Sequence, residues 1–122
     1  MHELAVCQSL LGEVARAAAA NGSHEVIRIV VAVGPLSGVE GPLLARAFDV
    51  ARCGTIAEHA ALEIEAVPVR VRCRICAVET ETRANALLCG RCGSWQVDLE
   101  SGGELLLQRV ELAVEADAAA AV

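Results

Sequence analysis

Four cysteines in two closely spaced pairs constrain the fold of this 122-residue chain more than any other feature. The segment CRIC contains Cys73 and Cys76, the segment CGRC contains Cys89 and Cys92, and 12 residues separate the two pairs. Each Cys-x-x-Cys can form a tight turn that points both sulfurs inward, and two such turns supply the four thiolates that zinc prefers. The alternative is a set of redox-active or buried cysteines, but paired motifs seldom lack a metal. The spacing therefore predicts a zinc-binding module with a short hairpin between the turns.

A shell of four thiolates leaves no open position for water or substrate, so the predicted zinc is structural. It would stabilise an insert of about 30 residues that is too short to fold on a core of its own. The remaining cysteines, Cys7 and Cys53, lie outside the paired motifs, and we expect buried or inert thiols at both positions.

The segments that flank the cysteine module predict a small α+β domain. Apolar residues at helical spacing predict a helix over 3–21, and Pro42 begins a second helix that runs to Gly54. Extended segments are predicted at 25–34, 62–71 and 104–114. We expect two helices packed on a small three-stranded mixed sheet, with a four-cysteine zinc-ribbon-like module inserted into it.

The predicted domain organisation follows from these elements. Residues 1–70 and 103–114 form one discontinuous α/β domain, and residues 71–102 form the zinc-binding module. The tail 115–122 has no periodic pattern, and we expect it to be disordered.

Charge and hydropathy argue against nucleic acid and membranes as partners. The formal net charge is −6, whereas both kinds of surface attract basic proteins. Arg70, Arg72 and Arg74 alternate along one side of an extended segment and Trp95 could stack on a base, but the same module carries acidic residues. No stretch reaches the roughly 18 apolar residues of a membrane span, and the chain does not begin like a secretory signal. We therefore expect a cytoplasmic protein.

The amino terminus, Met1-His2-Glu3, offers a second kind of metal site. We expect Met1 to be retained, because processing removes it only before small side chains. Its amine, the His2 amide and the His2 imidazole can then chelate one ion, with Glu3 as a further ligand. A nitrogen-rich, near-planar set suits Ni(II) or Cu(II) better than zinc. A solvated terminal histidine without metal is the alternative, and for His24 and His59 it is the preferred interpretation.

The chain resembles the HypA/HybF family of hydrogenase nickel-insertion proteins over residues 1 to about 114. Four stretches carry the resemblance together with the paired cysteines. They are Met1-His2-Glu3, VGPLSGVE at 33–40, GTIAEHAALEIE at 54–65 and GGELLLQRVELAV at 102–114.

The resemblance implies a nickel metallochaperone with a structural zinc site. His2 is then the expected nickel ligand, with Met1 and Glu3 contributing, and the α/β domain is the nickel-binding domain. Glu40 is a weaker candidate near that site. The expected zinc ligands are Cys73, Cys76, Cys89 and Cys92. The implied partners are a HypB-type GTPase and the large subunit of [NiFe] hydrogenase, and in some organisms urease accessory proteins.

Gly90 stands where many members of the family have proline, and no histidine flanks either cysteine turn. The leading hypothesis is a non-enzymatic carrier that binds and releases Ni(II) by ligand exchange. The alternative is a zinc-ribbon interaction adaptor without a nickel function. An enzyme is the least favoured class, because the sequence has no Ser/His/Asp set, phosphate-binding glycine loop or open metal shell.

Overall fold

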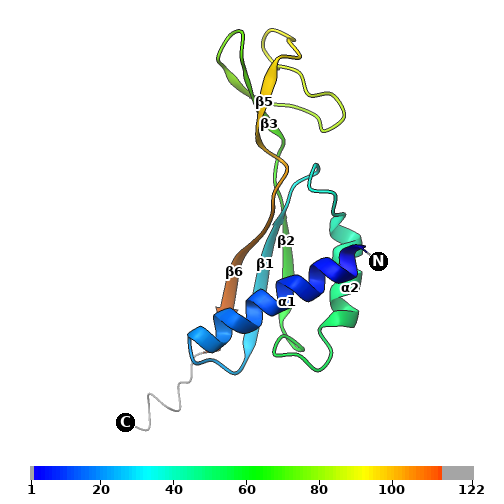
Figure 1. The fold of residues 1–122 in the computed structure, drawn as a ribbon, viewed down its shortest axis with the longest axis vertical. Coiled ribbons are helices and arrows are strands. Elements are labelled where there is room, and N and C mark those ends of the chain that lie inside the picture. Colours follow the sequence, from blue (N-terminus) through cyan, green and yellow to red (C-terminus); the bar gives the residue numbers. More distant parts are fainter. Residues whose placement is uncertain (1, 114–122) are drawn as a thin grey trace. The chain divides into compact units, whose positions relative to one another are not determined.

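The computed structural model describes residues 2–113 of the chain (Figure 1). The predicted disordered tail at 115–122 and the residue Met1 lie outside the described residues. The elements in chain order are α1 (His2–Ala20), β1 (Val26–Val33), α2 (Gly41–Ala51), β2 (Ala61–Ala66), β3 (Arg70–Cys73), β4 (Glu79–Glu81), β5 (Val97–Ser101) and β6 (Leu105–Leu112).

Helix α1 forms where the apolar spacing predicts it. Its buried residues follow the three-and-four pattern of one helical stripe. They are Cys7, Leu11, Val14 and Ala18. The helix ends at Ala20. Gly22 follows in the turn, where its φ of 66° is the left-handed conformation that glycine adopts readily, and its amide donates to the carbonyl of Ala19 at 3.2 Å.

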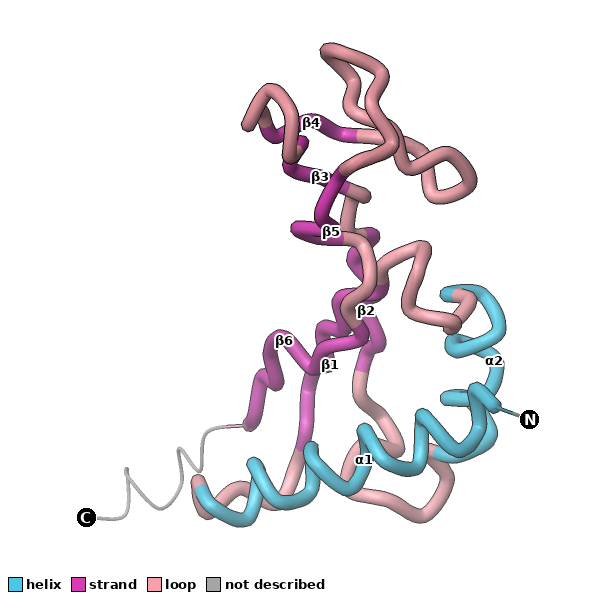
Figure 2. Tube along the Cα trace, turned by 45° about the horizontal axis from the view of Figure 1, so that its top comes forward, coloured by secondary structure: helices cyan, strands magenta, loops and turns pink. Residues whose placement is uncertain are grey.

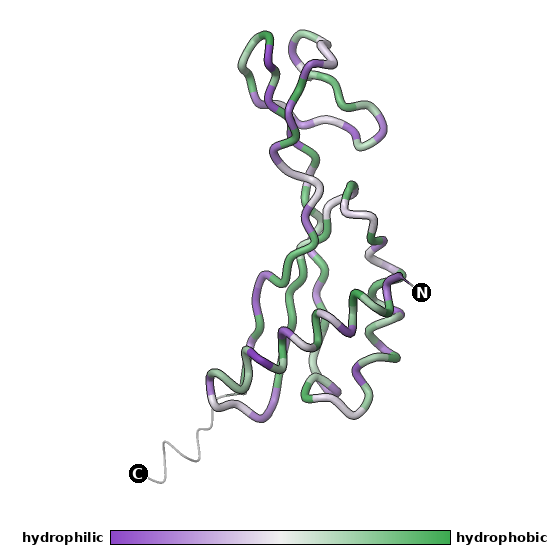
Figure 3. The backbone as a smooth tube through the Cα atoms, viewed as in Figure 1, coloured by the Kyte–Doolittle hydropathy of each residue, from purple (hydrophilic) through white to green (hydrophobic). Residues whose placement is uncertain are grey.

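The strands β2, β1 and β6 form the first sheet, in that order. Hydrogen bonds from Ala113 N to Glu25 O and from Gly34 N to Glu104 O lie at opposite ends of the β1–β6 pair, so these strands are antiparallel. Strand β1 is predominantly hydrophobic (Figure 3). Two helices and a small three-stranded sheet were predicted, and both are present.

Both helices lie on the same face of the first sheet (Figure 2). Ile29 and Val31 of β1 contact the same small internal cavity as residues from α1, α2 and β2. Ile27 of β1 is 50% exposed, whereas Val26 before it and Ile29 two residues after it are buried. The core of this part of the chain is aliphatic, with Phe48 of α2 as its aromatic residue.

The prediction of one strand over 62–71 is wrong. The segment divides into β2 and β3, with Pro68 in the interruption between them. Proline has no amide to donate to a strand ladder, so the first sheet ends before it. The segment resumes as β3, which belongs to a second sheet in the order β4-β3-β5.

The second sheet is antiparallel throughout. Val71 of β3 pairs with Thr80 of β4, and Cys73 pairs with Val97 of β5. Val71 is fully buried, and it is the central apolar residue of a sheet whose other positions are largely exposed. This sheet was not predicted as such, although a hairpin between the cysteine turns was expected.

The chain divides into two compact units. The first unit comprises the described residues of 1–31, 42–63 and 107–122, and it includes both helices. The second unit comprises residues 32–41 and 64–106, and it includes β3, β4 and β5. The predicted domain boundaries after residues 70 and 102 stay a prediction.

Candidate metal centre

The first cysteine turn begins at the last residue of β3. The Cys73 amide donates to the carbonyl of Val78 at 3.0 Å, and the Ala77 amide donates back to the carbonyl of Cys73 at 3.0 Å. Ala77 has a φ of 62°, in the left-handed region that costs a residue with a side chain roughly 1–2 kcal/mol. The turn therefore holds a strained residue directly after its second cysteine.

The second cysteine turn repeats this geometry. The Cys89 amide donates to the carbonyl of Ser94 at 2.8 Å, and the Gly93 amide donates to the carbonyl of Cys89 at 2.9 Å. Gly93 occupies the left-handed position, with a φ of 77°, and as glycine it does so without steric cost. The two turns thus present their sulfurs in the same way.

Backbone amides inside each turn point at the first sulfur. The amides two and three residues after Cys73 and after Cys89 donate to those sulfurs at 3.3 to 3.4 Å. Hydrogen bonds from the Cys92 and Arg91 amides lower the pKa of Cys89 to about 6, and the Cys76 amide contributes most to lowering the pKa of Cys73. Both turns therefore favour thiolates, the form that binds metal.

Cys92 differs from Cys73 and Cys89 in the direction of its pKa shift. The amide of Ser94 lowers the pKa of Cys92, but the sulfur of Cys73, burial and the two other sulfurs outweigh it and raise that pKa to about 11. A metal ion that binds all four sulfurs would therefore displace the proton of Cys92.

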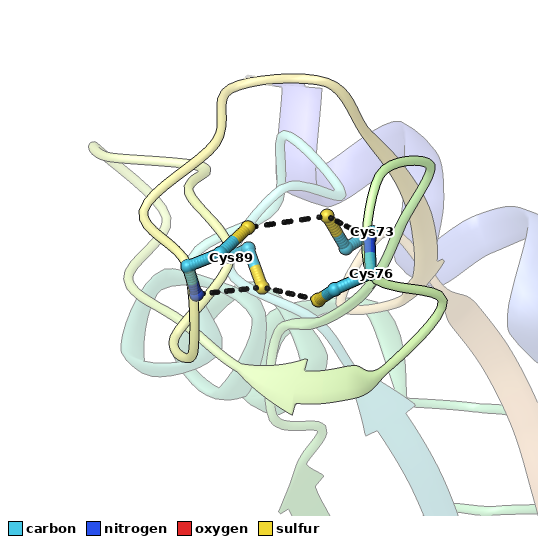
Figure 4. Close-up of side chains that lie close together, drawn as sticks. Cys73, Cys76 and Cys89 are labelled. Atoms are coloured by element: carbon cyan, nitrogen blue, oxygen red, sulfur yellow. Dashed lines mark hydrogen bonds between the residues drawn. The ribbon is translucent and has the colours of Figure 1, made fainter.

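The four sulfurs converge on a common point. All four lie within 4.8 Å of one another, and the pairs Cys73–Cys92 and Cys76–Cys89 are 3.6 Å apart. In Figure 4 the labelled side chains of Cys73, Cys76 and Cys89 extend toward one another from both turns. Tetrahedral zinc with bonds of about 2.3 Å separates its sulfurs by roughly 3.8 Å, so the geometry fits zinc. All of these cysteines are free thiols.

The three alternating arginines, two in β3 and one directly after it, are paired with carboxylates of neighbouring strands. Each guanidinium has a carboxylate partner across the sheet, which removes the free positive charge that phosphate binding needs. The pairs are Arg70–Glu79 at 2.8 Å, Arg72–Glu100 at 3.3 Å and Arg74–Asp98 at 2.6 Å.

The predicted nickel ligands occupy the first turn of α1. His2 is exposed and Glu3 is half-buried, and they are the first two residues of the helix. Met1 lies outside the described residues. Glu40 is exposed in the loop before α2 and belongs to the second unit, whereas His2 belongs to the first. The assignment of all four residues to a nickel site stays a prediction.

The two unpaired cysteines have different surroundings. Cys7 is buried, and its thiol donates to the carbonyl of Leu44 at 3.4 Å, as expected for a buried thiol. Cys53 is exposed, which excludes the buried alternative there, and its inertness stays a prediction. It is exposed because α2 already ends at Ala51, which places Cys53 in the turn beyond it.

Sequence reasoning missed the residues that shape the turns. The glycine after Cys92 signals a left-handed position, but Ala77 carries no such signal. Thr80 of β4 and Thr82, just beyond the end of β4, bond to the loop around Cys89, and their role depends on a strand pairing that spacing alone does not reveal.

The fold and the centre together define a small α+β protein with a cluster of four cysteines that could hold a metal ion. Among residues 2–113, no helix has the length and apolar character to cross a bilayer.

The family model described as "Hydrogenase/urease nickel incorporation, metallochaperone, hypA" matches residues 1–112. The hydrogenase maturation factor HypA of Nitrosospira multiformis is 44% identical over 112 residues, covering 92% of this chain and 97% of the relative. The corresponding factor of Aquifex aeolicus is 38% identical over 115 residues, covering 94% and 100%. The solution structure of the Ni metallochaperone HypA from Helicobacter pylori superposes with a TM-score of 0.68 at 28% identity, covering 93% and 98%.

The chain therefore belongs to the HypA family of nickel metallochaperones and maturation factors, as the sequence resemblance indicated. The family is not one of known catalytic enzymes.

Proposed function

We propose that this protein carries Ni(II) for the maturation of [NiFe] hydrogenase. It binds the ion at its amino terminus through His2, with Met1 and Glu3 contributing, and holds a structural Zn(II) at its four paired cysteines. A HypB-type GTPase and the hydrogenase large subunit are the proposed partners, and the cytoplasm is the proposed compartment.

The observation that carries this proposal is the location of His2 in the first turn of α1, exposed, within a family match that covers residues 1–112. The first amides of a helix have no intrahelical acceptor, so chelation there leaves the helix intact. A cation at a helix N-terminus opposes the dipole by about 0.3–1 kcal/mol, and the charge of Glu3 offsets this cost.

Two metals require two separate sites, and the chemistry of the donors supports that division. Four converging sulfurs would fill the coordination shell of zinc and leave no position for a transient cargo. Nitrogen donors at the terminus suit Ni(II) and release it when protons compete for them. A carrier needs this second property, because it must give up its ion by ligand exchange.

The test is a nickel titration of untagged protein and its His2→Ala variant, with zinc measured in both. We expect His2→Ala to weaken nickel binding by more than about 100-fold, beyond the loss typical of an outer-shell change. Zinc should stay near one equivalent in each protein. The matched control is His24→Ala, because His24 is also exposed and in the same unit.

Equal nickel affinity in wild type and His2→Ala would refute the nickel site and leave the zinc-ribbon adaptor as the remaining function. An extension placed ahead of Met1 provides an independent check, because it blocks the amine without changing any side chain. We expect that extension to weaken nickel binding as His2→Ala does.

A further inference from the structure

Cys89 lies in a loop, in contrast to Cys73, which ends a strand. The segment between β4 and β5 is a long loop in Figure 2, with one isolated bridge between Arg83 and Ala86. A metal ligand on a loop needs contacts that fix its distance from the other ligands. The question is which contacts fix the position of Cys89.

Two threonines of the β4 segment bond to the residues on either side of Cys89. The hydroxyl of Thr80 accepts a hydrogen bond from the Gly90 amide at 2.8 Å. The hydroxyl of Thr82 accepts from the Leu88 amide at 3.5 Å and donates to a loop carbonyl at 2.8 Å. Being two residues apart, the threonines lie on one face of an extended segment.

Close packing supports the first of these bonds. A Cβ atom added to Gly90 would lie 3.2 Å from the Cβ of Thr80 and 3.3 Å from its hydroxyl oxygen. The loop backbone therefore approaches Thr80 at a distance that only glycine permits without a shift. Thr80 in turn pairs with Val71 of β3, two residues before Cys73. A continuous set of contacts thus links the two cysteine turns through Thr80.

We infer that Thr80 is a positioning residue for the zinc centre, which sets the location of Cys89 relative to Cys73 and thereby the zinc affinity, with Thr82 in a supporting role. The inference rests on the proposed zinc site. It predicts that loss of the Thr80 hydroxyl lowers zinc affinity even when the fold is retained.

The experiment is a zinc competition titration, with the rate of zinc transfer to a chelator as a second readout. We expect Thr80→Val, which keeps the side-chain volume, to weaken zinc binding by about 10- to 100-fold and to speed its release. Thr80→Ser restores the hydroxyl and should return both values to near wild type. Thr55→Val is the matched control, because Thr55 also bonds to nearby backbone but lies in the first unit.

Gly90→Pro removes the donor instead of the acceptor and also adds a Cβ that would lie 3.2 Å from the Cβ of Thr80, so it should weaken zinc binding at least as much as Thr80→Val. If the hydrogen bond between Gly90 and Thr80 carries the effect, the double variant should lose less zinc-binding free energy than the sum of the losses in the two single variants. Zinc affinity of Thr80→Val within about twofold of wild type would overturn the inference. A Thr80→Val variant with lower thermal stability but an unchanged rate of zinc release would also overturn the inference, because that result indicates a merely structural role. Wild type without zinc would instead refute the zinc part of the proposed function.

Discussion

The substitution Gly34→Ala tests the close contact between the backbone just after β1 and the backbone of Gly102. A Cβ at this position would overlap the carbonyl oxygen of Gly102. Gly102 is itself packed closely against Val69, because a Cβ added to Gly102 would lie 2.9 Å from the Cα of Val69. Its φ of 112° is also a conformation that restricts how its backbone can shift. The contact is between backbones of three segments of the second unit, so no side-chain rotation relieves it.

The expected loss of stability follows from the bonds at this point. The Gly34 amide donates to Glu104 O at 2.8 Å, and the Leu36 amide donates to Gly102 O at 2.8 Å. Losing both hydrogen bonds costs about 2 kcal/mol. The overlap that remains between the added Cβ and the backbone of Gly102 costs about 1–3 kcal/mol. The alanine also restricts the unfolded chain, which offsets about 0.4–1 kcal/mol. The free energy of unfolding should therefore fall by about 2–5 kcal/mol.

The assay is urea unfolding of the zinc-loaded protein, followed by the fluorescence of Trp95, the one tryptophan, which lies in the second unit. Gly103→Ala is the matched control, because its added Cβ would meet only Leu99 at an ordinary 3.5 Å. We expect the control to stay within about 0.5 kcal/mol of wild type. If Gly34→Ala also stays within that range, the backbone contact with Gly102 does not exist in solution.

Three further predictions concern the first unit. Arg52→Met should lower the free energy of unfolding by about 2–4 kcal/mol, measured by urea unfolding, because Arg52 donates to two loop carbonyls at 2.7 and 2.6 Å and stacks on Phe48 at 4.8 Å. In zinc-loaded protein Cys53 should react with a thiol reagent at once, whereas Cys7 should react only on unfolding; a fast second thiol would contradict this. Burial, with a smaller contribution from Glu3, raises the pKa of Cys7 above its ordinary value of 9.0. The folded protein then keeps a proton that the unfolded chain loses, so the free energy of unfolding should fall as pH rises from about 9, and Cys7→Ala should reduce that slope.

The features that sequence predicts best here are local in the chain. The stripe of α1 is fixed by helical periodicity, and its four innermost residues are buried as expected. The cysteine spacing is likewise local, because each turn closes within a few residues, and the four sulfurs do converge.

The features that sequence does not reveal depend on contacts between distant segments. Pro68 divides a segment whose alternating pattern predicts one strand, and only the pairing of β3 with β5 shows that the chain enters a second sheet. The hydroxyl of Thr80 meets Gly90 ten residues later, and Gly34 meets Gly102 across the second unit. Such long-range contacts depend on the register of the strands and on the conformation of the loops, which residue type alone does not encode.

The most direct test of the central claim is X-ray absorption at both the nickel and the zinc K-edge, on untagged protein loaded with one equivalent each of zinc and nickel. We expect nickel surrounded by nitrogen and oxygen, with imidazole scattering that His2→Ala abolishes, while zinc retains sulfur neighbours at about 2.3 Å. Sulfur neighbours around nickel would place the cargo at the paired cysteines and contradict the division into a terminal nickel site and a structural zinc centre.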